Sequence, residues 1–105
     1  MTVATTPANL FAVGDILVSS WGYDQTNIDF YQVVKVTKAT IGIRAIRSTV
    51  TETGYMSGQS EPRPGVFDSD ELLTKRPNKF GYVRMNSFSG AVKWDGKPRY
   101  VSWYA

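Results

Sequence analysis

Aromatic, amide and carboxylate side chains are concentrated between Ser20 and Tyr31. A loop of this composition combines stacking surfaces with hydrogen-bond donors and acceptors, which suits recognition of a base edge, a peptide backbone or a sugar. A structural interpretation is also open, in which Asp24 and Asn27 bond the local backbone while Trp21 and Tyr31 close one end of the core. The candidate contact residues of this segment are Trp21, Tyr23, Asp24, Gln25 and Asn27.

A second candidate surface lies in the last third of the chain, where cations and aromatic rings occur together. Residues 75–105 hold seven Lys or Arg residues against one acidic residue, Asp95, and seven of the fourteen aromatic residues. Nucleic-acid-binding proteins place cations against phosphates and aromatic faces against unpaired bases. A core of strand aromatics beneath a solvated outer face would give the same pattern. The candidate contact residues here are Lys75, Arg76, Lys79, Tyr82, Arg84, Trp94, Lys97 and Arg99.

The chain lacks the side chains on which most enzymes depend. It has no His and no Cys, so the commonest general base, the commonest metal ligand and the commonest strong nucleophile are absent. Its nine Asp and Glu residues are scattered, and no Gly-rich phosphate loop is followed by Lys-Ser or Lys-Thr. We therefore expect a binding protein that is not an enzyme and that uses no cofactor, no metal and no disulfide.

Alternating apolar and polar residues predict the strands that position these side chains. Residues 16–18, 29–37 and 40–46 each fit a strand of a half-buried antiparallel sheet, and Lys38-Ala39 fits a tight turn. The predicted face pattern follows from the period of two residues. One face of the second strand would hold Phe30, Val34 and Val36, and the inward face of the third would hold Ile41, Ile43 and Ala45, with Gly42 and Arg44 outward.

The second half of the chain is predicted as a long loop and two hairpins. Residues 53–70 contain three Gly and two Pro, too many for regular structure, so we expect a loop there. Residues 71–76 and 80–85 would pair around a turn at 77–79. A further hairpin would turn at Asp95-Gly96, and Pro98 would place the last strand at a sheet edge or a bulge.

These elements predict an all-β fold, a small antiparallel SH3-like barrel or sandwich of six to seven short strands, because no helical period persists for three turns. Residues 1–12 would form a loose arm, and residues 13–105 a single β domain with the long 53–70 loop. The sequence has neither a bilayer-length apolar run nor the features of a signal peptide, so we expect a cytoplasmic protein.

Three segments resemble a family of small uncharacterised proteins encoded by phages, prophages and plasmids. The most specific is SWGYDQTNIDFYQVV at residues 20–34, in which the motif SWGYDQTNxDFYQV is complete. The others are LTKRPNK at 73–79, which continues through 81–87, and WDGKP at 94–98 with the closing SWYA. The resemblance implies an accessory protein of a mobile element, acting in the cytoplasm of a host bacterium. It implies no catalytic residues.

Two functions fit these features, and the sequence leaves both open. In the first, the basic and aromatic last third binds DNA or RNA, with cations on phosphates and Tyr23, Gln25, Asn27 and Trp94 on bases. In the second, the 20–31 segment and the 53–70 loop bind a host protein, for example a defence complex, and inhibit or adapt it. A pocket for a small anionic ligand such as a nucleotide is a third possibility.

Overall fold

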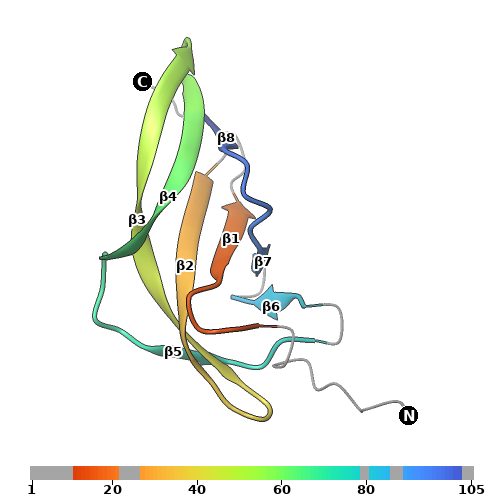
Figure 1. Cartoon of the computed structure of the whole chain (residues 1–105). Coiled ribbons are helices and arrows are strands. Elements are labelled where there is room, and N and C mark those ends of the chain that lie inside the picture. The colour runs from red at the N-terminus through yellow and green to blue at the C-terminus, as the bar shows by residue number, and fades with distance from the viewer. Residues whose placement is uncertain (1–10, 22–26, 79–80, 86–88, 103–105) are drawn as a thin grey trace.

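Short runs of β-branched and aromatic residues, separated by Gly, Pro and Asn, favour strands over helices along this chain. The computed structural model describes residues 11–21, 27–78, 81–85 and 89–102, and all regular structure in these ranges is antiparallel β (Figure 1). None of these ranges holds a helix with the length and apolarity needed to cross a bilayer. The strands are β1 (Ile16–Trp21), β2 (Asn27–Val36), β3 (Ile41–Gly54), β4 (Ser57–Phe67), β5 (Leu73–Lys75), β6 (Val83–Arg84), β7 (Gly90–Lys93) and β8 (Arg99–Ser102).

The eight strands form one open sheet with the order β6-β7-β1-β2-β3-β4-β8, and β5 pairs with β3 beside this path. The all-β prediction is confirmed, although the described residues hold eight strands and not six or seven. The predicted barrel closure is not found, because the terminal strands β6 and β8 do not pair with each other. The sheet stays open because the second half of β3 leaves β2 and continues only with β4.

Both faces of the sheet bury apolar side chains. Successive residues of a strand point to opposite faces, and the apolar run of β1 therefore serves two cores. Leu17 belongs to a first cluster with Phe11, Val33, Ile41, Ile43, Val83 and Ala91. Ile16 and Val18 belong to a second cluster with Phe30 and Ile46. Phe11, which the sequence assigned to the N-terminal arm, is thus a core residue.

A bulge in β2 changes the predicted face pattern of this strand. Val33 pairs with Ile43, but Lys35 pairs with Gly42, so Val34 is the extra residue. Val36 consequently packs against the first cluster with Val33, whereas Phe30 lies in the second cluster. The prediction that Phe30, Val34 and Val36 share a face is wrong, because a bulge shifts the alternation by one residue.

The segment predicted as a long loop is mostly a strand. Residues 57–67 form β4, which pairs with β3 from Ser48↔Pro62 to Gly54↔Ser57. The two glycines near the turn fit the ladder, and a Cβ at Gly58 would lie 2.5 Å from the backbone oxygen of Thr51. The loop prediction failed because cross-strand hydrogen bonds outweigh the low strand propensity of Gly and Pro.

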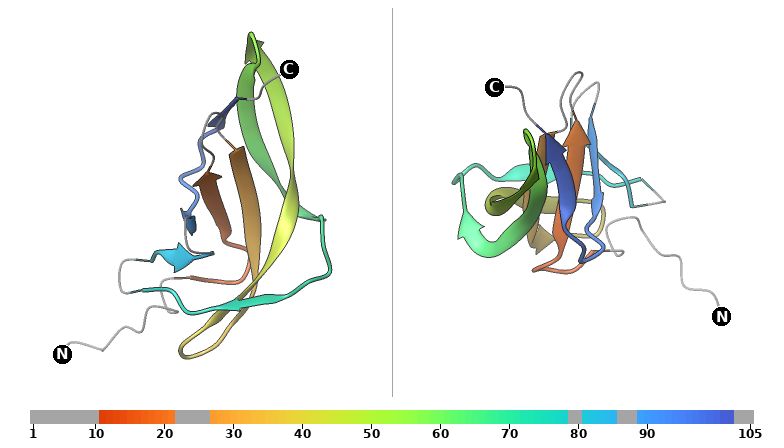
Figure 2. Two further views of the ribbon diagram at one scale, coloured as in Figure 1. Left: turned by 180° about the vertical axis from the view of Figure 1, so that it is seen from behind. Right: turned by 90° about the horizontal axis from the view of Figure 1, so that it is seen from above.

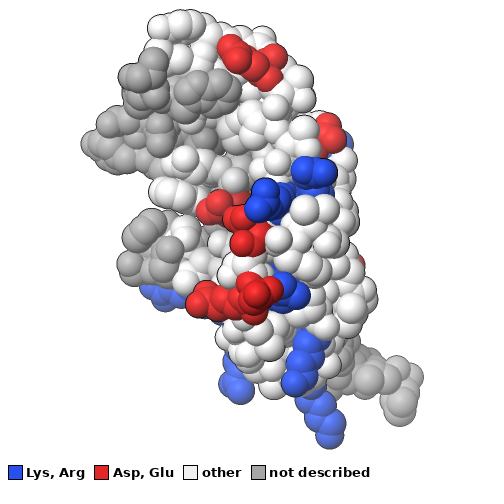
Figure 3. Space-filling view, turned by 90° about the vertical axis from the view of Figure 1, so that its left-hand side faces the viewer, with Lys and Arg blue, Asp and Glu red and all other residues white. Residues whose placement is uncertain are grey.

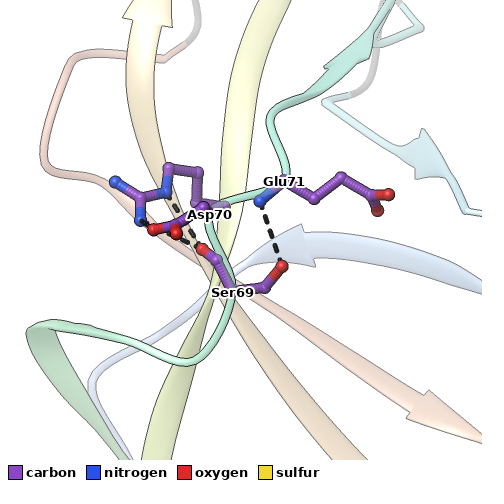
Figure 4. Close-up of polar contacts among 4 residues, drawn as sticks. Ser69, Asp70 and Glu71 are labelled. Carbon is purple, nitrogen blue, oxygen red and sulfur yellow. Dashed lines mark hydrogen bonds and ion pairs between the residues drawn. The ribbon is translucent and has the colours of Figure 1, made fainter.

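A wide bulge at residues 63–66 interrupts this ladder opposite Arg47. Gly65, at φ 77°, donates its backbone N–H to Oε1 of Gln32 on β2 (2.7 Å). Arg44 then holds the crossover to β5: its guanidinium donates to the backbone oxygen of Ser69 (3.0 and 3.1 Å) and to Asp70 (3.1 Å) (Figure 4). The same guanidinium stacks over Phe67, 4.0 Å from the ring centroid. Arg44 and Gly42, predicted to face outward, are therefore half-buried and buried.

The strands of the last third do not form the hairpins between consecutive segments that the sequence predicts. β5 pairs with β3, and β6 pairs with β7, so the predicted 71–76 and 80–85 hairpin is wrong. The Asp95-Gly96 turn forms, with Gly96 at φ 86° and the Lys97 N–H bonded to Asp95 (3.0 Å). However, β7 pairs with β1 and β8 pairs with β4, so the two strands that flank this turn do not pair with each other. β8 is a terminal strand, as Pro98 predicted.

The resulting molecule is elongated, with extents of 53 × 25 × 25 Å. The left-hand view in Figure 2 shows that the β3–β4 hairpin extends past β2 at one end, while the β2–β3 turn projects past β5 at the other. We call these the hairpin end (residues 48–60) and the basic end (residues 35–41 and 73–76). They are joined by β3, which runs between them along its 14 residues.

Candidate nucleic-acid interface

The basic end brings together cations from two segments that are far apart in the sequence. Lys35 and Lys38 come from β2 and the β2–β3 turn, and Lys75 and Arg76 from β5 and the residue after it. Because β5 pairs with β3, Lys75 lies opposite Ile41 and Lys35 lies opposite Gly42. With strands about 4.8 Å apart, the backbones of Lys35 and Lys75 are about 10 Å apart.

The turn that carries Lys38 is held by hydrogen bonds of two threonines. The Thr37 N–H donates to the Thr40 backbone oxygen (2.9 Å), and the two hydroxyl groups contact each other at 2.7 Å. Lys38 and Ala39 therefore form a tight turn, as the sequence predicted. The cations lie on both faces of this hairpin, because Lys35 shares a row with Gly42 and Thr74, and Lys75 shares the next row with Val36 and Ile41.

These four cations are distinguished by being gathered at one end of the molecule. Among the residues that the structure describes, none of the four takes part in an ion pair. Toward the middle, positive and negative side chains are intermixed, whereas the lower end in Figure 3 shows only Lys and Arg. The ion pairs elsewhere join Arg44–Asp70, Arg47–Asp68, Lys93–Asp15 and Arg99–Asp95 at 3.1 to 3.7 Å. Positive potential is therefore uncompensated at the basic end.

Tyr82 directly precedes β6 and Arg84 lies in it, and this strand is at the same end of the molecule in Figure 1. The Tyr82 ring is 42% exposed and lies against β7, where a Cβ at Gly90 would collide with it. Val83 between them is buried, whereas Tyr82 and Arg84 are exposed. An exposed ring next to cations is the arrangement on which an unpaired base stacks.

Other predicted site residues lie away from the basic end or are engaged in the fold. Trp94 packs edge-on against Phe30, with ring centroids 6.2 Å apart, and its indole N–H donates to the Lys97 backbone oxygen (2.7 Å). Arg99 is half-buried on β8 and pairs with Asp95. Trp94 and Arg99 therefore serve the fold, and the structure does not place Arg99 with Lys75 and Arg76. Tyr23, Asp24, Gln25 and Lys79 lie outside the described residues.

Of the 20–31 segment, the structure describes the end of β1 and the beginning of β2. Trp21 is 40% exposed, pairs with Asn27 across β1 and β2, and donates its indole N–H to Oδ2 of Asp29 (2.6 Å). Burial and the nearby Asp29 carboxylate raise the pKa of Tyr31 above its ordinary value. Tyr31 packs against the first cluster, whereas Trp21 belongs to neither cluster, so its ring does not close the core.

Sequence reasoning missed Lys35 and Lys38. The signal was a pair of lysines around a predicted hairpin turn, but the partner cations on β5 come from 37 and more residues later in the chain. Within the described ranges there is no group of acidic residues that could hold a metal ion. A surface of free ammonium and guanidinium groups binds anions, above all a row of phosphates.

Comparisons with protein-family models, with curated proteins and with solved structures found no match to this chain.

Proposed function

We propose that this protein is a non-enzymatic nucleic-acid-binding protein that contacts the phosphate backbone through its basic end. The observation that carries the proposal is a set of four cations that form no ion pair with the part of the chain that the structure describes and that come from two segments: Lys35, Lys38, Lys75 and Arg76. Cations that are clustered and not neutralised by neighbouring carboxylates create a positive potential, and this potential attracts a polyanion. The resemblance of the 20–34 segment supports an accessory role for a phage or plasmid in its host.

The shape of the basic end favours a duplex as the ligand. The β2–β3 turn projects past β5 as a two-stranded ribbon (Figure 2). A ribbon of this kind fits the major groove of B-DNA, which is about 12 Å wide. Lys35 and Lys75, on opposite faces of the sheet beside this turn, would then reach the phosphates on the two walls of the groove, with Lys38 at its floor.

The proposal is tested by fluorescence anisotropy with labelled duplex DNA, single-stranded DNA and RNA over a range of salt concentrations. Four phosphate contacts predict a slope of log K against log salt of about −3.6 for a duplex and about −2.8 for a single strand. Between 50 and 200 mM salt the affinity for a duplex should thus fall about 150-fold. A wild-type protein that binds none of the three ligands at low salt contradicts the proposal.

A matched pair of variants separates a defined surface from general positive charge. Lys38→Gln should weaken binding and reduce the duplex slope by about 0.9, because one phosphate contact is lost. Gln59→Glu makes the same change in net charge on the exposed face of β4 at the hairpin end, and it should leave the slope unchanged. Equal losses in the two variants would show that the basic end is not the interface.

The alternative, a protein partner for the 20–31 segment, keeps one supporting observation. Trp21 is partly exposed at the end of β1, and tryptophan is enriched among residues that dominate protein interfaces. Its indole N–H is already bonded to Asp29, so only the ring face is left for a partner. Nuclease-treated host lysate passed over wild-type and Trp21→Ala protein tests this alternative, which requires a partner that only the wild type retains.

A further inference from the structure

The hairpin end contains a long strand edge without a partner. β2 pairs with β3 only as far as Phe30↔Ile46, and beyond this point β3 pairs on its other side with β4. All seven residues from Arg47 to Thr53 are exposed. No strand of the described part of the chain pairs with them on the side that β2 has left. Figure 1 shows this half of β3 continuing past the end of β2.

The hydrogen-bonding direction of this edge follows from the ladder. The Ala45 backbone oxygen accepts from the Asp68 N–H (2.9 Å) on the side away from β2, and the Thr51 backbone oxygen faces Gly58 on β4. Backbone groups alternate between the two sides of a strand, so those of Ser48, Val50 and Glu52 point to the open side. Pro62, which has no N–H, lies opposite Ser48, where the β3–β4 ladder needs no donor.

The sequence of this edge is self-complementary. Val50 is flanked by Thr49 and Thr51, with one cation, Arg47, and one anion, Glu52, farther out. In an antiparallel pairing of two such edges about Val50, the two Val50 residues exchange backbone hydrogen bonds, and each Thr49 lies opposite Thr51 of the second copy. Thr–Thr pairs stabilise a ladder, and an edge without net charge does not repel its copy.

We infer that two copies of this protein associate through the edge of β3, from Ser48 to Glu52, to form one continuous sheet across a two-fold axis. A two-fold axis uses the same patch on both copies, which is what a self-complementary edge provides. Val50 is 50% exposed in the single chain and would be covered by its counterpart.

A cleft at the base of this edge is placed to receive the hairpin tip of the second copy. It has a volume of about 480 Å³ and lies in the fork where β2 and β3 separate, between residues 28–31 and 45–48. In the antiparallel register about Val50, Glu52 of the second copy lies opposite Ser48, so the tip that follows it enters the fork. That tip carries Tyr55, the most exposed of the large hydrophobic residues described, at 87%.

Charged groups at the cleft suit a polar hairpin tip. Arg63 lies in the wall and takes part in no ion pair among the described residues, and Arg47 reaches Asp68 only at 3.7 Å. The Arg63 guanidinium is thus available to bind the hydroxyl of Tyr55 or the backbone oxygens of the second copy's turn. Dimerisation would therefore pair the β3 edge and fill the cleft at the same time.

The terminal strand β8 is less suited to this role. β8 has only four residues, and Pro98 precedes it without an N–H to donate. The β3 edge is longer and contains no Pro. Pairing of two β3 edges also places the two basic ends at opposite extremities, roughly 60 Å apart, because each Ile41 lies nine residues from Val50. A dimer of this kind would present two nucleic-acid contacts.

Sedimentation and cross-linking of the full chain test the inference. The wild type should sediment at twice the 11.7 kDa of the chain as its concentration rises. Val50→Pro removes the donor on the open side without removing a bond to β4, so it should be monomeric, whereas Val50→Thr keeps the N–H and should remain dimeric. Circular dichroism of each variant reports whether the sheet is intact.

Cysteine cross-linking gives an answer even if Val50→Pro does not fold. The chain has no Cys, so Val50→Cys introduces a single thiol. The Cα atoms of a hydrogen-bonded antiparallel pair are about 5.5 Å apart, within the range that a disulfide spans. Oxidation should link Val50→Cys into a covalent dimer, while Gln59→Cys on β4 should stay monomeric. A wild type that is monomeric at every concentration, or a dimer that links equally through both positions, overturns the inference.

Discussion

The two ends of the molecule contain the same strand, β3, in two different environments. At the basic end β3 lies between β2 and β5, and Ile41 and Ile43 are completely buried in the first cluster. At the hairpin end it has β4 on one side and none of the described strands on the other, and its residues from 47 to 54 are exposed. The difference shows that one strand can anchor a core with one half and present an interface with the other.

The comparison also separates two kinds of surface. The basic end combines a rigid core with free cations, which suits a ligand held by charge. The hairpin end carries Thr, Val and Tyr55 with one cation and one anion on its free edge, which suits a ligand held by backbone hydrogen bonds. Stability should therefore reside at the basic end, and mutations there should cost more.

The largest expected effect comes from the first cluster. Ile41→Ala, at the basic end, should lower the free energy of unfolding by about 2–5 kcal/mol, because it leaves a cavity in a fully buried site. Val101→Ala, on β8 opposite Gly58 of the hairpin end, should cost about 1.5 kcal/mol for two methyl groups. Urea unfolding measures both, and equal losses would show that the two ends contribute equally to stability.

A smaller effect is expected from the glycines of β4, and it sharpens the comparison within the hairpin end. Gly58→Ala should destabilise the protein by about 1–3 kcal/mol, since its Cβ would lie 2.5 Å from the Thr51 backbone oxygen and the ladder must shift. Gly65→Ala meets no atom within 4 Å but has φ 77°, so its cost should be about 1–2 kcal/mol of backbone strain. Thermal unfolding of both variants is the measurement. A silent Gly58→Ala would mean that the β3–β4 ladder is loose in solution.

The smallest effect concerns pH and Tyr31, at the fork between the two ends. Its pKa is raised in the folded protein by burial and by Asp29, so the unfolded chain loses this proton first as the pH rises. The stability that depends on the neutral phenol is complete below pH 10 and is lost as the pH rises through the folded pKa. Tyr31→Phe should therefore lose less stability than the wild type between pH 9 and pH 11 in urea unfolding. Equal losses would place Tyr31 in a more solvated environment than the fork.

Local patterns were sufficient for the strands that fold against their sequence neighbours. The apolar run at Ile16, the alternation after Asp29 and the turn at Lys38-Ala39 all predicted their elements, because a hairpin is determined by residues a few positions apart. The same reasoning failed for residues 57–67, and it failed to predict the partners of the strands β5, β6, β7 and β8. In these segments the partner strand lies far away in the chain, and Gly and Pro were interpreted as loop residues without knowledge of the ladder that holds them.

The candidate site shows the same division. Lys75 and Arg76 were predicted as cations of a binding surface, but their proximity to Lys35 depends on β5 pairing with β3 and not with the segment that follows it. Trp94 was predicted as a contact residue, yet its ring packs against Phe30. Composition distinguishes neither case, because a strand aromatic and a surface aromatic follow the same period of two residues.

The sequence by itself determined the all-β class, through alternation and the lack of a helical period, and it restricted the chemistry, because a chain without His and Cys lacks the usual catalytic side chains. The tertiary structure decided which cations have counter-ions and which strand edge has no partner. Both depend on contacts between residues distant in the chain. Local propensity contains no information on such contacts, whereas the cooperative packing of two apolar clusters selects them.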